Sequence, residues 1–556
     1  MIWKHWPLTD LQNYITSIDG QLLERLGHML PVIEGHSYDP TSLMLKKNLA
    51  KIAMAFAPSD CFANTTFMRS CLEKLPPDEL IKLCNHTGTL VTTNTFVARM
   101  EALLRRRWSD NLFSNAFIDF FSLPDHFKVK RHFNVEATEI VEPPTEENPI
   151  QIISPYKTLK DYQFGVYIEA IEKVQVPNSR FILQMPTGSG KTRTAVEIIS
   201  SYVNNCRSSD VAVVWLAHSE ELCEQAYQCF KEVWSHVTTK SLTMVRAWSG
   251  NTIPVGIHGP MFVVGSFQGL YSDLEEGNSI FDTIKDRIHL IIVDEAHKTV
   301  APTYKKVVKA LNGDNSHIIG LTATPGRTIV EETHELAEFY FQNIIGISPN
   351  GAESVISYLK QVKVLSEVEY EPLITGISYA LTDNQLKRLS AELDYSPDFL
   401  KQIANDDLRN IEIFKRLLDE CRSGRKVLFF GCSIQQSRFI SALLVYFGIN
   451  SAHVDGKTDK RRRADIIAQF KRGNIQVLCN FGILSTGFDA PNTDTVFITR
   501  PTNSAVLYSQ MIGRGLRGPA VGGTSSCKII DVIDNIIGYG DSDRVYRYFD
   551  EYWNQT

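Results

Sequence analysis

The hydrophobic residues of this chain follow two patterns, and the change between them falls near residue 155. In the first part, apolar residues recur three or four positions apart, as at Phe96, Met100 and Leu103. This spacing places apolar side chains on one face of a helix. The pattern predicts an all-α domain over residues 1–140.

The second part consists of short valine-, isoleucine- and leucine-rich runs separated by stretches of helical spacing. Continuous apolar runs suit strands buried on both faces, and their alternation with helices indicates a parallel sheet. A first group of runs lies at residues 181–184, 211–216, 261–265, 290–293 and 317–321. A second group lies at residues 427–430, 452–454, 477–480 and 495–498. The pattern therefore predicts two doubly wound α/β domains in tandem.

The predicted domain boundaries follow changes in composition. The acidic, proline-rich segment Glu142-Pro-Pro-Thr-Glu-Glu-Asn-Pro149 cannot bury a core and is typical of a linker. We assign the linker to residues 141–154. The first α/β domain is expected over residues 155–345 and the second over residues 346–556. Helical segments between 330 and 425 predict a helical insertion in the second domain.

A glycine-rich sequence follows the first predicted strand and leads into a helix. It reads Met185-Pro-Thr-Gly-Ser-Gly-Lys-Thr192, with methionine in place of the first glycine of the simple phosphate-loop pattern. In this setting backbone N–H groups surround phosphates, the lysine reaches the β- and γ-phosphates, and the hydroxyl binds Mg²⁺. The sequence thus predicts ATP and Mg²⁺ as cofactors. The expected ligands are Gly188, Ser189, Gly190, Lys191 and Thr192.

Two adjacent carboxylates end a later apolar strand, in Leu290-Ile-Ile-Val-Asp-Glu-Ala-His297. Acids at a buried strand end are costly unless a cation compensates them. Asp294 is therefore expected to bind Mg²⁺ together with Thr192, and Glu295 to deprotonate the attacking water. The alternative is a solvated turn after a strand, which leaves the upstream lysine loop unexplained.

The order of these motifs resembles that of the superfamily-2 helicases and translocases, whose DEAH signature stands at residues 294–297. The resemblance covers residues 155–540 and implies two RecA-like domains. It implies that Gln163 reads adenine. Coupling of hydrolysis to domain closure is implied for His297, Thr322 and Thr324. Further ATP contacts are implied from the fifth motif, residues 481–489, at Gly487 and Asp489.

The sixth motif, Gln510-Met-Ile-Gly-Arg-Gly-Leu-Arg517, places two arginines three positions apart. Hydrolysis builds negative charge on the γ-phosphoryl oxygens, and a guanidinium from a second domain stabilises it by about 10³- to 10⁵-fold in rate. Arg514 and Arg517 are therefore expected to be catalytic, so that hydrolysis depends on domain closure, and the resemblance implies a catalytic role for Gln510 as well. The alternative is a surface helix with solvated arginines.

Nucleic-acid contacts are implied on both α/β domains by the same resemblance. Small polar residues near helix starts suit phosphate contacts, which carry no sequence information. The implied residues are Ala217, His218, Ser266, Gln268, Gly431, Ser433, Ser485 and Thr486. Basic clusters at 105–107, 128–131 and 460–463 either extend this path or are solvated faces. The net charge of −6 argues against a DNA-coating protein, but a motor with a few placed phosphate contacts needs no basic average.

Within the superfamily, the motor motifs look most like those of bacterial RadD-type helicases and of the motor part of type I restriction subunits. The resemblance implies an ATP-dependent helicase or translocase that acts on single-stranded or duplex DNA in bacterial repair or anti-phage defence. RNA is the alternative substrate. No cysteine-rich zinc module of the RadD type follows Arg517 in this sequence, so repair and defence stay open. A hypothesis of another class is a nucleotide-gated interaction module whose helical domain recruits a protein partner.

The remaining composition bears on the compartment. The 10 cysteines contain no CxxC pair, which suits a reducing environment. No apolar run approaches the roughly 18 residues of a membrane helix, and the first residues lack a basic and apolar leader. The sequence predicts a cytoplasmic protein without membrane contact.

Overall fold

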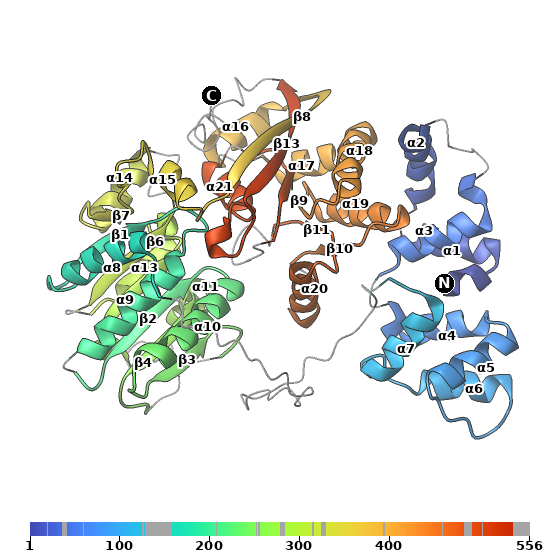
Figure 1. Ribbon diagram of the computed structural model, residues 1–556, viewed down its shortest axis with the longest axis horizontal. Coiled ribbons are helices and arrows are strands. Elements are labelled where there is room, and N and C mark those ends of the chain that lie inside the picture. Colours follow the sequence, from blue (N-terminus) through green and yellow to red (C-terminus); the bar gives the residue numbers. More distant parts are fainter. Residues whose placement is uncertain are drawn as a thin grey trace.

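Two parallel β-sheets, each covered by helices, form most of the molecule, and a group of helices lies at one end (Figure 1). The computed structural model describes residues 1–18, 20–35, 42–58, 61–124, 127, 158–206, 208–251, 253, 256–277, 284–313, 316–323, 330–392, 395–456, 458, 460–482, 492–502 and 504–537. The predicted fold class is confirmed: two tandem RecA-like α/β domains follow a helical N-terminal region. None of the helices in the described ranges has the length and apolar character of a membrane span.

The N-terminal region is helical throughout its described part. Its helices are α1 (Leu8–Ile18), α2 (Leu22–Glu34), α3 (Lys46–Phe56), α4 (Thr65–Glu73), α5 (Pro77–His86), α6 (Phe96–Leu104) and α7 (Asn111–Phe121). Side chains cap three of them: Asn64 accepts from the first turn of α4, Thr95 from that of α6 and Asp110 from that of α7. Buried aromatic rings fill the space between the helices, with the centroids of Trp3 and Phe62 5.5 Å apart.

The first sheet has the strand order β3-β4-β2-β5-β6-β1-β7, and all its pairings are parallel. Its strands are β1 (Arg180–Gln184), β2 (Ala212–Ala217), β3 (Thr243–Ala247), β4 (Met261–Ser266), β5 (Ile288–Asp294), β6 (His317–Thr322) and β7 (Ile344–Gly346). The covering helices are α8 (Asp161–Lys173), α9 (Lys191–Asn205), α10 (Glu220–Val237), α11 (Phe267–Glu275), α13 (Pro302–Leu311) and α14 (Val330–Phe339). The central strands are buried along their whole length because helices cover both faces.

The second sheet has the order β10-β11-β9-β12-β13-β8 and is also fully parallel. Its strands are β8 (Glu367–Ala380), β9 (Val427–Phe430), β10 (Ser451–Val454), β11 (Val477–Asn480), β12 (Thr495–Ile498) and β13 (Ser526–Ile537). Its helices are α15 (Val355–Gln361), α16 (Asp383–Glu392), α17 (Pro397–Ala404), α18 (Asp407–Arg422), α19 (Ile434–Tyr446), α20 (Lys460–Arg472) and α21 (Ala505–Ile512). The long strands β8 and β13, neither of which the apolar runs predict, form its edge (Figure 1).

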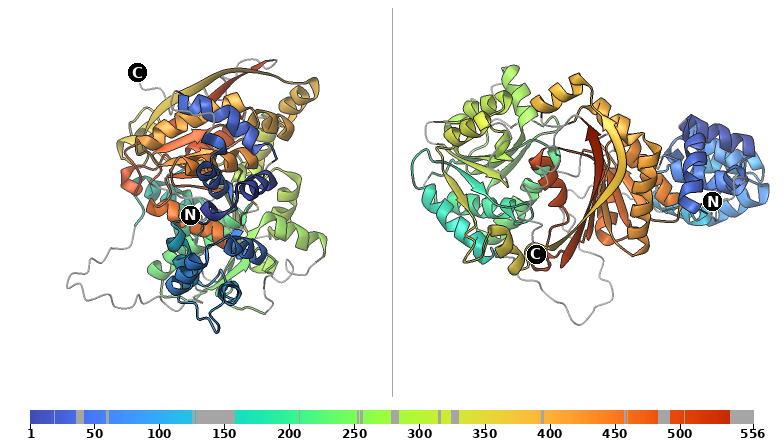
Figure 2. Two further views of the ribbon diagram at one scale, coloured as in Figure 1. Left: turned by 90° about the vertical axis from the view of Figure 1, so that its right-hand side faces the viewer. Right: turned by 90° about the horizontal axis from the view of Figure 1, so that it is seen from above.

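The N-terminal helices pack on the second RecA-like domain, although the first domain follows them in sequence (Figure 2). Helix α2 lies against α18 and α3 against α19, within one continuous hydrophobic core. Arg25 forms an ion pair of 2.8 Å with Asp407 and lies 4.5 Å from the ring centroid of Phe439. The ring of Phe56 lies 5.7 Å from that of Phe439. The helical region and the second domain therefore share a well-packed interface.

Candidate active site

The glycine-rich loop connects β1 to α9 at the carboxyl end of the first sheet. Gly188 and Gly190 have φ angles of 86° and 90°, which residues with a side chain rarely adopt. The Lys191 ammonium group donates to the carbonyl oxygens of Met185, at 3.0 Å, and Pro186, at 3.4 Å. The loop thus encloses its own lysine through main-chain oxygens, and phosphate oxygens could replace these acceptors.

Helix α8 holds the loop from behind. The Gln163 amide nitrogen donates to the Ser189 carbonyl at 3.3 Å, and the Tyr162 hydroxyl donates to the same oxygen at 2.8 Å. The Gln163 amide oxygen accepts from the Lys160 backbone at 3.0 Å. A Cβ at Gly190 would overlap the Gln163 side chain. Sequence reasoning named Gln163 but missed Tyr162, whose only signal was its place beside that glutamine.

The acidic pair ends strand β5, two strands away from β1 in the sheet. Glu295 has a φ of 52°, in the left-handed region, and its backbone N–H donates to the Asp294 carboxylate at 3.0 Å. Burial, followed by the neighbouring Glu295 charge, raises the pKa of Asp294 to about 7. Two acids packed side by side at a buried strand end resist double ionisation, and a bound divalent cation would remove this conflict.

Glu295 is the member of the pair that stays ionised. Burial opposes its charge, but nearby positive groups, His297 first and then Lys191 and Lys298, outweigh burial and lower its pKa. The Lys191 pKa is lowered by burial, which the Glu295 and Asp294 charges oppose and the Arg514 charge reinforces. A carboxylate held ionised beside a carboxyl with a raised pKa is suited to accept a proton from water.

His297 connects the acidic pair to strand β6. Its Nδ1 lies 3.2 Å from the Thr322 hydroxyl and 3.4 Å from the Glu295 carboxylate. The structure therefore brings together three of the residues expected in this part of the site. The fourth, Thr324, lies outside the described residues.

The second domain reaches this site through the end of α21. A Cβ at Gly513 would lie 2.7 Å from the Thr187 Cβ, and one at Gly188 would lie 3.8 Å from Arg517 Cγ. The sixth motif thus abuts the phosphate loop, and Arg514 is close enough to influence Lys191. Sequence reasoning missed Thr187 as the contact point. Gly487 and Asp489, expected at the same cleft, lie outside the described residues.

The described candidates for nucleic-acid contact differ in exposure. Ala217 and Gly431 are buried, and Ser433 is buried as the cap of α19, where it accepts from Gln436 at 3.0 Å. Ser266 caps α11 by accepting from Gly269. Gln268, in the first turn of α11, is exposed. Ser485 and Thr486 lie outside the described residues.

His218, another candidate for nucleic-acid contact, lies beside the residues of the ATP site. Leu216 pairs with Val293 in the β2–β5 register, so His218 follows β2 where Glu295 follows β5. Burial, reinforced by Lys298, lowers the His218 pKa to about 4, and the imidazole is neutral at physiological pH. The strand register therefore places His218 beside Glu295, a neighbour that sequence order alone does not reveal.

Two family models match the chain over the parts that carry this site. Residues 156–327 match "Type III restriction enzyme, res subunit", and residues 409–518 match "Helicase conserved C-terminal domain". The two matched regions fall on the two RecA-like domains: the first resembles a restriction-enzyme subunit and the second the conserved C-terminal domain of helicases.

Proteins similar to this chain occur in eukaryotes and archaea. IRC3 of Saccharomyces cerevisiae, named as a putative ATP-dependent helicase, is 27% identical over 384 residues, 67% of this chain and 51% of that protein. The chain therefore spans about half the length of this curated relative. The protein named DNA 3'-5' translocase XPB2 of Sulfurisphaera tokodaii is 22% identical over 438 residues, 74% of this chain and 89% of that protein. The solved structure of S. cerevisiae Dbp5 bound to RNA and ADP BeF3 covers 72% of this chain and 92% of that chain, with 14% identity and a TM-score of 0.46.

Proposed function

We propose that this protein is a DEAH-type motor that hydrolyses ATP between its two RecA-like domains to move along or unwind DNA. The observation that carries the proposal is the seating of Gly513 on Thr187, which brings the arginines of one domain to the phosphate loop of the other. An ATPase site completed by a second domain is what links hydrolysis to domain movement.

The residues of the site fit ATP and Mg²⁺. The glycine loop offers main-chain N–H groups around a lysine, which is the geometry of a phosphate cradle. The Asp294 pKa is raised because its ionised form is buried beside Glu295, and a bound cation would stabilise that form. The described part of the chain holds no cluster of three metal-ligating acids, histidines or cysteines, which suits a Mg²⁺ ion held by one carboxylate, a hydroxyl, water and phosphate. Asp294 and Thr192 would hold Mg²⁺, and Lys191 the β- and γ-phosphates.

The chain's own groups then divide the work of hydrolysis. Glu295, ionised and oriented by His297, accepts the proton of the attacking water. Arg514 and Arg517, with Gln510 beside them, neutralise the charge that develops on the transferred group. Gln163 reads the adenine edge while it clamps the Ser189 carbonyl. Thr322 and Thr324 couple closure of the domains to the state of this site, through the His297 contact.

The substrate class is argued from relatives and from the shape of the candidate surface. One family model is that of a restriction-enzyme subunit, and one relative is named as a DNA translocase, so we infer DNA as the substrate and RNA as the alternative. Gln268 and the backbone around Ser266, Gly431 and Ser433 would contact the phosphates of one strand. All ten cysteines are free thiols, which suits action in the cytoplasm. A role in bacterial DNA repair or anti-phage defence fits these features equally.

The experiment that tests the motor is ATPase turnover with and without single-stranded DNA, duplex DNA and RNA. Lys191→Ala should lose ATP binding, whereas Glu295→Gln should bind ATP and lose turnover by about 10²-fold or more. Equal turnover with and without every nucleic acid would contradict the proposal, and near-normal hydrolysis by Glu295→Gln would show that another group is the base. Strand separation on tailed DNA and RNA duplexes then decides between the two substrates.

A second function, recruitment of a protein partner by the helical region, is favoured by the packing of α2 and α3 on α18 and α19. A partner held there would move with the second domain when ATP closes the cleft. Deletion of residues 1–140 would expose apolar residues of α18 and α19, because these two helices share one hydrophobic core with the N-terminal helices. Point substitutions on the exposed side of α4–α7 are therefore a better test than the deletion. Each variant is assayed for ATPase turnover and for unwinding in the absence of a partner.

A further inference from the structure

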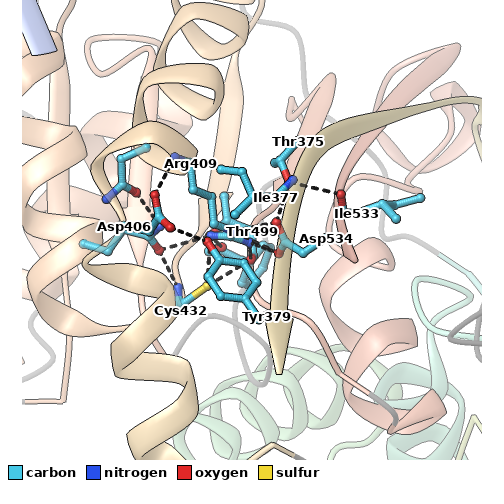
Figure 3. A network of polar contacts seen from close by, with 12 residues as sticks. Thr375, Ile377, Tyr379, Asp406, Arg409, Cys432, Thr499, Ile533 and Asp534 are labelled. Atoms are coloured by element: carbon cyan, nitrogen blue, oxygen red, sulfur yellow. Dashed lines mark hydrogen bonds and ion pairs between the residues drawn. The ribbon is translucent and has the colours of Figure 1, made fainter. Parts of the chain in front are cut away.

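A single buried arginine lies at the centre of the second domain. Arg409, in α18, is 0% exposed, and Figure 3 shows its side chain extending between the helices and the strands β8 and β13. Its Nε donates to both carboxylate oxygens of Asp534, at 3.0 and 2.9 Å. The same guanidinium donates to the Thr499 carbonyl at 2.5 Å and to the Cys432 sulfur at 3.5 Å.

A second set of hydrogen bonds, made by Gln436, joins Cys432 to Thr499 as Arg409 does. The Gln436 amide oxygen accepts from the Cys432 backbone at 2.7 Å and from the Thr499 hydroxyl at 3.2 Å. The Cys432 thiol donates to the Thr499 carbonyl at 2.9 Å. Two independent sets of hydrogen bonds therefore join the loop after β9 to the end of β12.

The two joined segments have different roles in the proposed motor. Cys432 lies between Gly431 and Ser433, the residues proposed to contact nucleic acid. Thr499 directly follows β12, and α21, which carries the sixth motif to the phosphate loop, begins six residues later at Ala505. Arg409 thus touches both the nucleic-acid loop and the strand that leads to the catalytic arginines.

Stability alone is a weak reason for this arrangement. Replacing a buried ion pair by packed apolar side chains is often neutral or stabilising, so such a pair is retained for what its geometry specifies. A guanidinium, unlike an ammonium group, can serve the carboxylate, the carbonyl and the sulfur at once, because its donors lie in a fixed plane. The fork fixes three segments relative to one another: β13, the end of β12 and the loop at 431–433.

We propose that Arg409 is a positioning residue that transmits the binding of nucleic acid at residues 431–433 to the arginines of the sixth motif. This inference rests on the proposed function, because it concerns how that motor is stimulated. A phosphate that displaces the loop would move Cys432, and the Arg409 and Gln436 bridges would carry the displacement to Thr499 and α21.

The test compares stimulation of ATP hydrolysis by oligothymidylate, defined as turnover at saturating oligonucleotide divided by turnover without it. Arg409→Lys keeps a positive charge for Asp534 but cannot reach all three acceptors. The stimulation ratio should fall by about fivefold or more. The affinity for oligothymidylate, measured by fluorescence anisotropy, should fall less than the ratio does.

Tyr379→Phe is the matched control. It removes the 2.9 Å hydrogen bond to Asp406, the residue that caps α18, but keeps the ring that packs beside Cys432 and all the hydrogen bonds of Arg409 and Gln436 (Figure 3). Its melting temperature should drop while its stimulation ratio stays at the wild-type value. An equal loss of stimulation in this variant would overturn the proposal, because general loosening of the domain would then explain both results.

If Arg409→Lys fails to fold, Cys432→Ala carries the test, since it removes only the sulfur contacts. Its ratio should fall by about twofold or more, and an unchanged ratio overturns the inference. A wild-type protein that oligothymidylate, duplex DNA and RNA all fail to stimulate overturns both the proposed function and this coupling. A stimulated wild type with an equally stimulated Arg409→Lys overturns the coupling alone.

Discussion

Gly513 of the second RecA-like domain lies directly against Thr187 of the first, so that a Cβ at position 513 would approach the Thr187 Cβ to 2.7 Å. The sixth motif can sit on the phosphate loop only because residue 513 has no side chain. This contact sets the distance between the catalytic arginines and Lys191.

Substitution of Gly513 by alanine should therefore separate binding from catalysis. The added methyl group would push the two domains apart by a fraction of an ångström or more, and misplacement by about 1 Å can cost about 10²-fold in rate. We expect kcat to fall strongly while ATP affinity, measured by a fluorescent analogue, changes little. Gly165→Ala, in α8 where an added Cβ meets nothing within 4 Å, is the control and should keep full turnover. Normal kcat in the Gly513 variant would contradict the observed closeness of the domains.

The two arginines of the sixth motif should be separately required. Arg514→Ala and Arg517→Ala each remove a charge that stabilises the transition state, and each should lower kcat by about 10³-fold. ATP binding should persist, because Lys191 remains. Arg422→Ala, an exposed arginine at the end of α18, serves as the charge-matched control. A tenfold weaker ATP affinity with unchanged kcat would assign these arginines to binding instead.

The Asp294 carboxyl should make stability depend on pH in the nucleotide-free protein. Its pKa is raised from 3.8 to about 7, so the folded state binds a proton more tightly than the unfolded state does. Stability from this residue is then full below its unfolded pKa and is lost progressively as the pH rises to about 7. Asp294→Asn removes this pH-dependent loss of stability. The melting temperature of the variant minus that of the wild type should therefore increase as the pH rises from about 4 to about 7.

The matched measurement for Asp294 is the same melting series with Mg²⁺ and a non-hydrolysable ATP analogue. A bound cation compensates the carboxylate, so the wild type should gain more from these ligands at pH 7 and above than at low pH. A melting-temperature difference that does not vary with pH would show that burial of Asp294 is relieved in some other way.

The interface between the helical region and the second domain should tolerate the loss of one ion pair. Arg25 and Asp407 are only partly buried, so their pairing is worth about 1 kcal/mol or less. Arg25→Glu should destabilise more than Arg25→Met, because it puts two like charges together beside the Phe439 ring. A double-mutant cycle with Asp407→Asn, read by chemical denaturation, measures the pair. A coupling energy of zero would show that packing of Phe56 and Phe439 alone holds the interface.

The sequence predicts five of the seven strands of the first sheet, because these five contain continuous apolar runs. All five runs expected there fall on strands β1, β2, β4, β5 and β6. The start of α16 is another local pattern, since Gln385 and Thr382 exchange side-chain to backbone hydrogen bonds of 2.9 and 3.3 Å. Such local patterns involve residues that are close in sequence, so they can be predicted from the sequence alone.

Strand β8 escaped prediction because it is an edge strand. Its residues alternate between exposed and half-buried, and Glu367, Glu369 and Glu371 interrupt every apolar run. The alternation itself is the signal of a half-buried strand, and Pro372 within it is typical of an edge. The sequence motifs name residues that the structure brings together at the phosphate loop, but they do not name Arg409, since its partner Asp534 lies 125 residues away and nothing local marks the pair.

The seating of α2 and α3 on the second domain turns that domain into a lever. Helices α4–α7 lie at the end of the molecule away from the first domain and share one hydrophobic core with the second domain (Figure 1). If the proposed closure of the ATP cleft rotates the second domain, the displacement of these helices grows with their distance from the rotation axis.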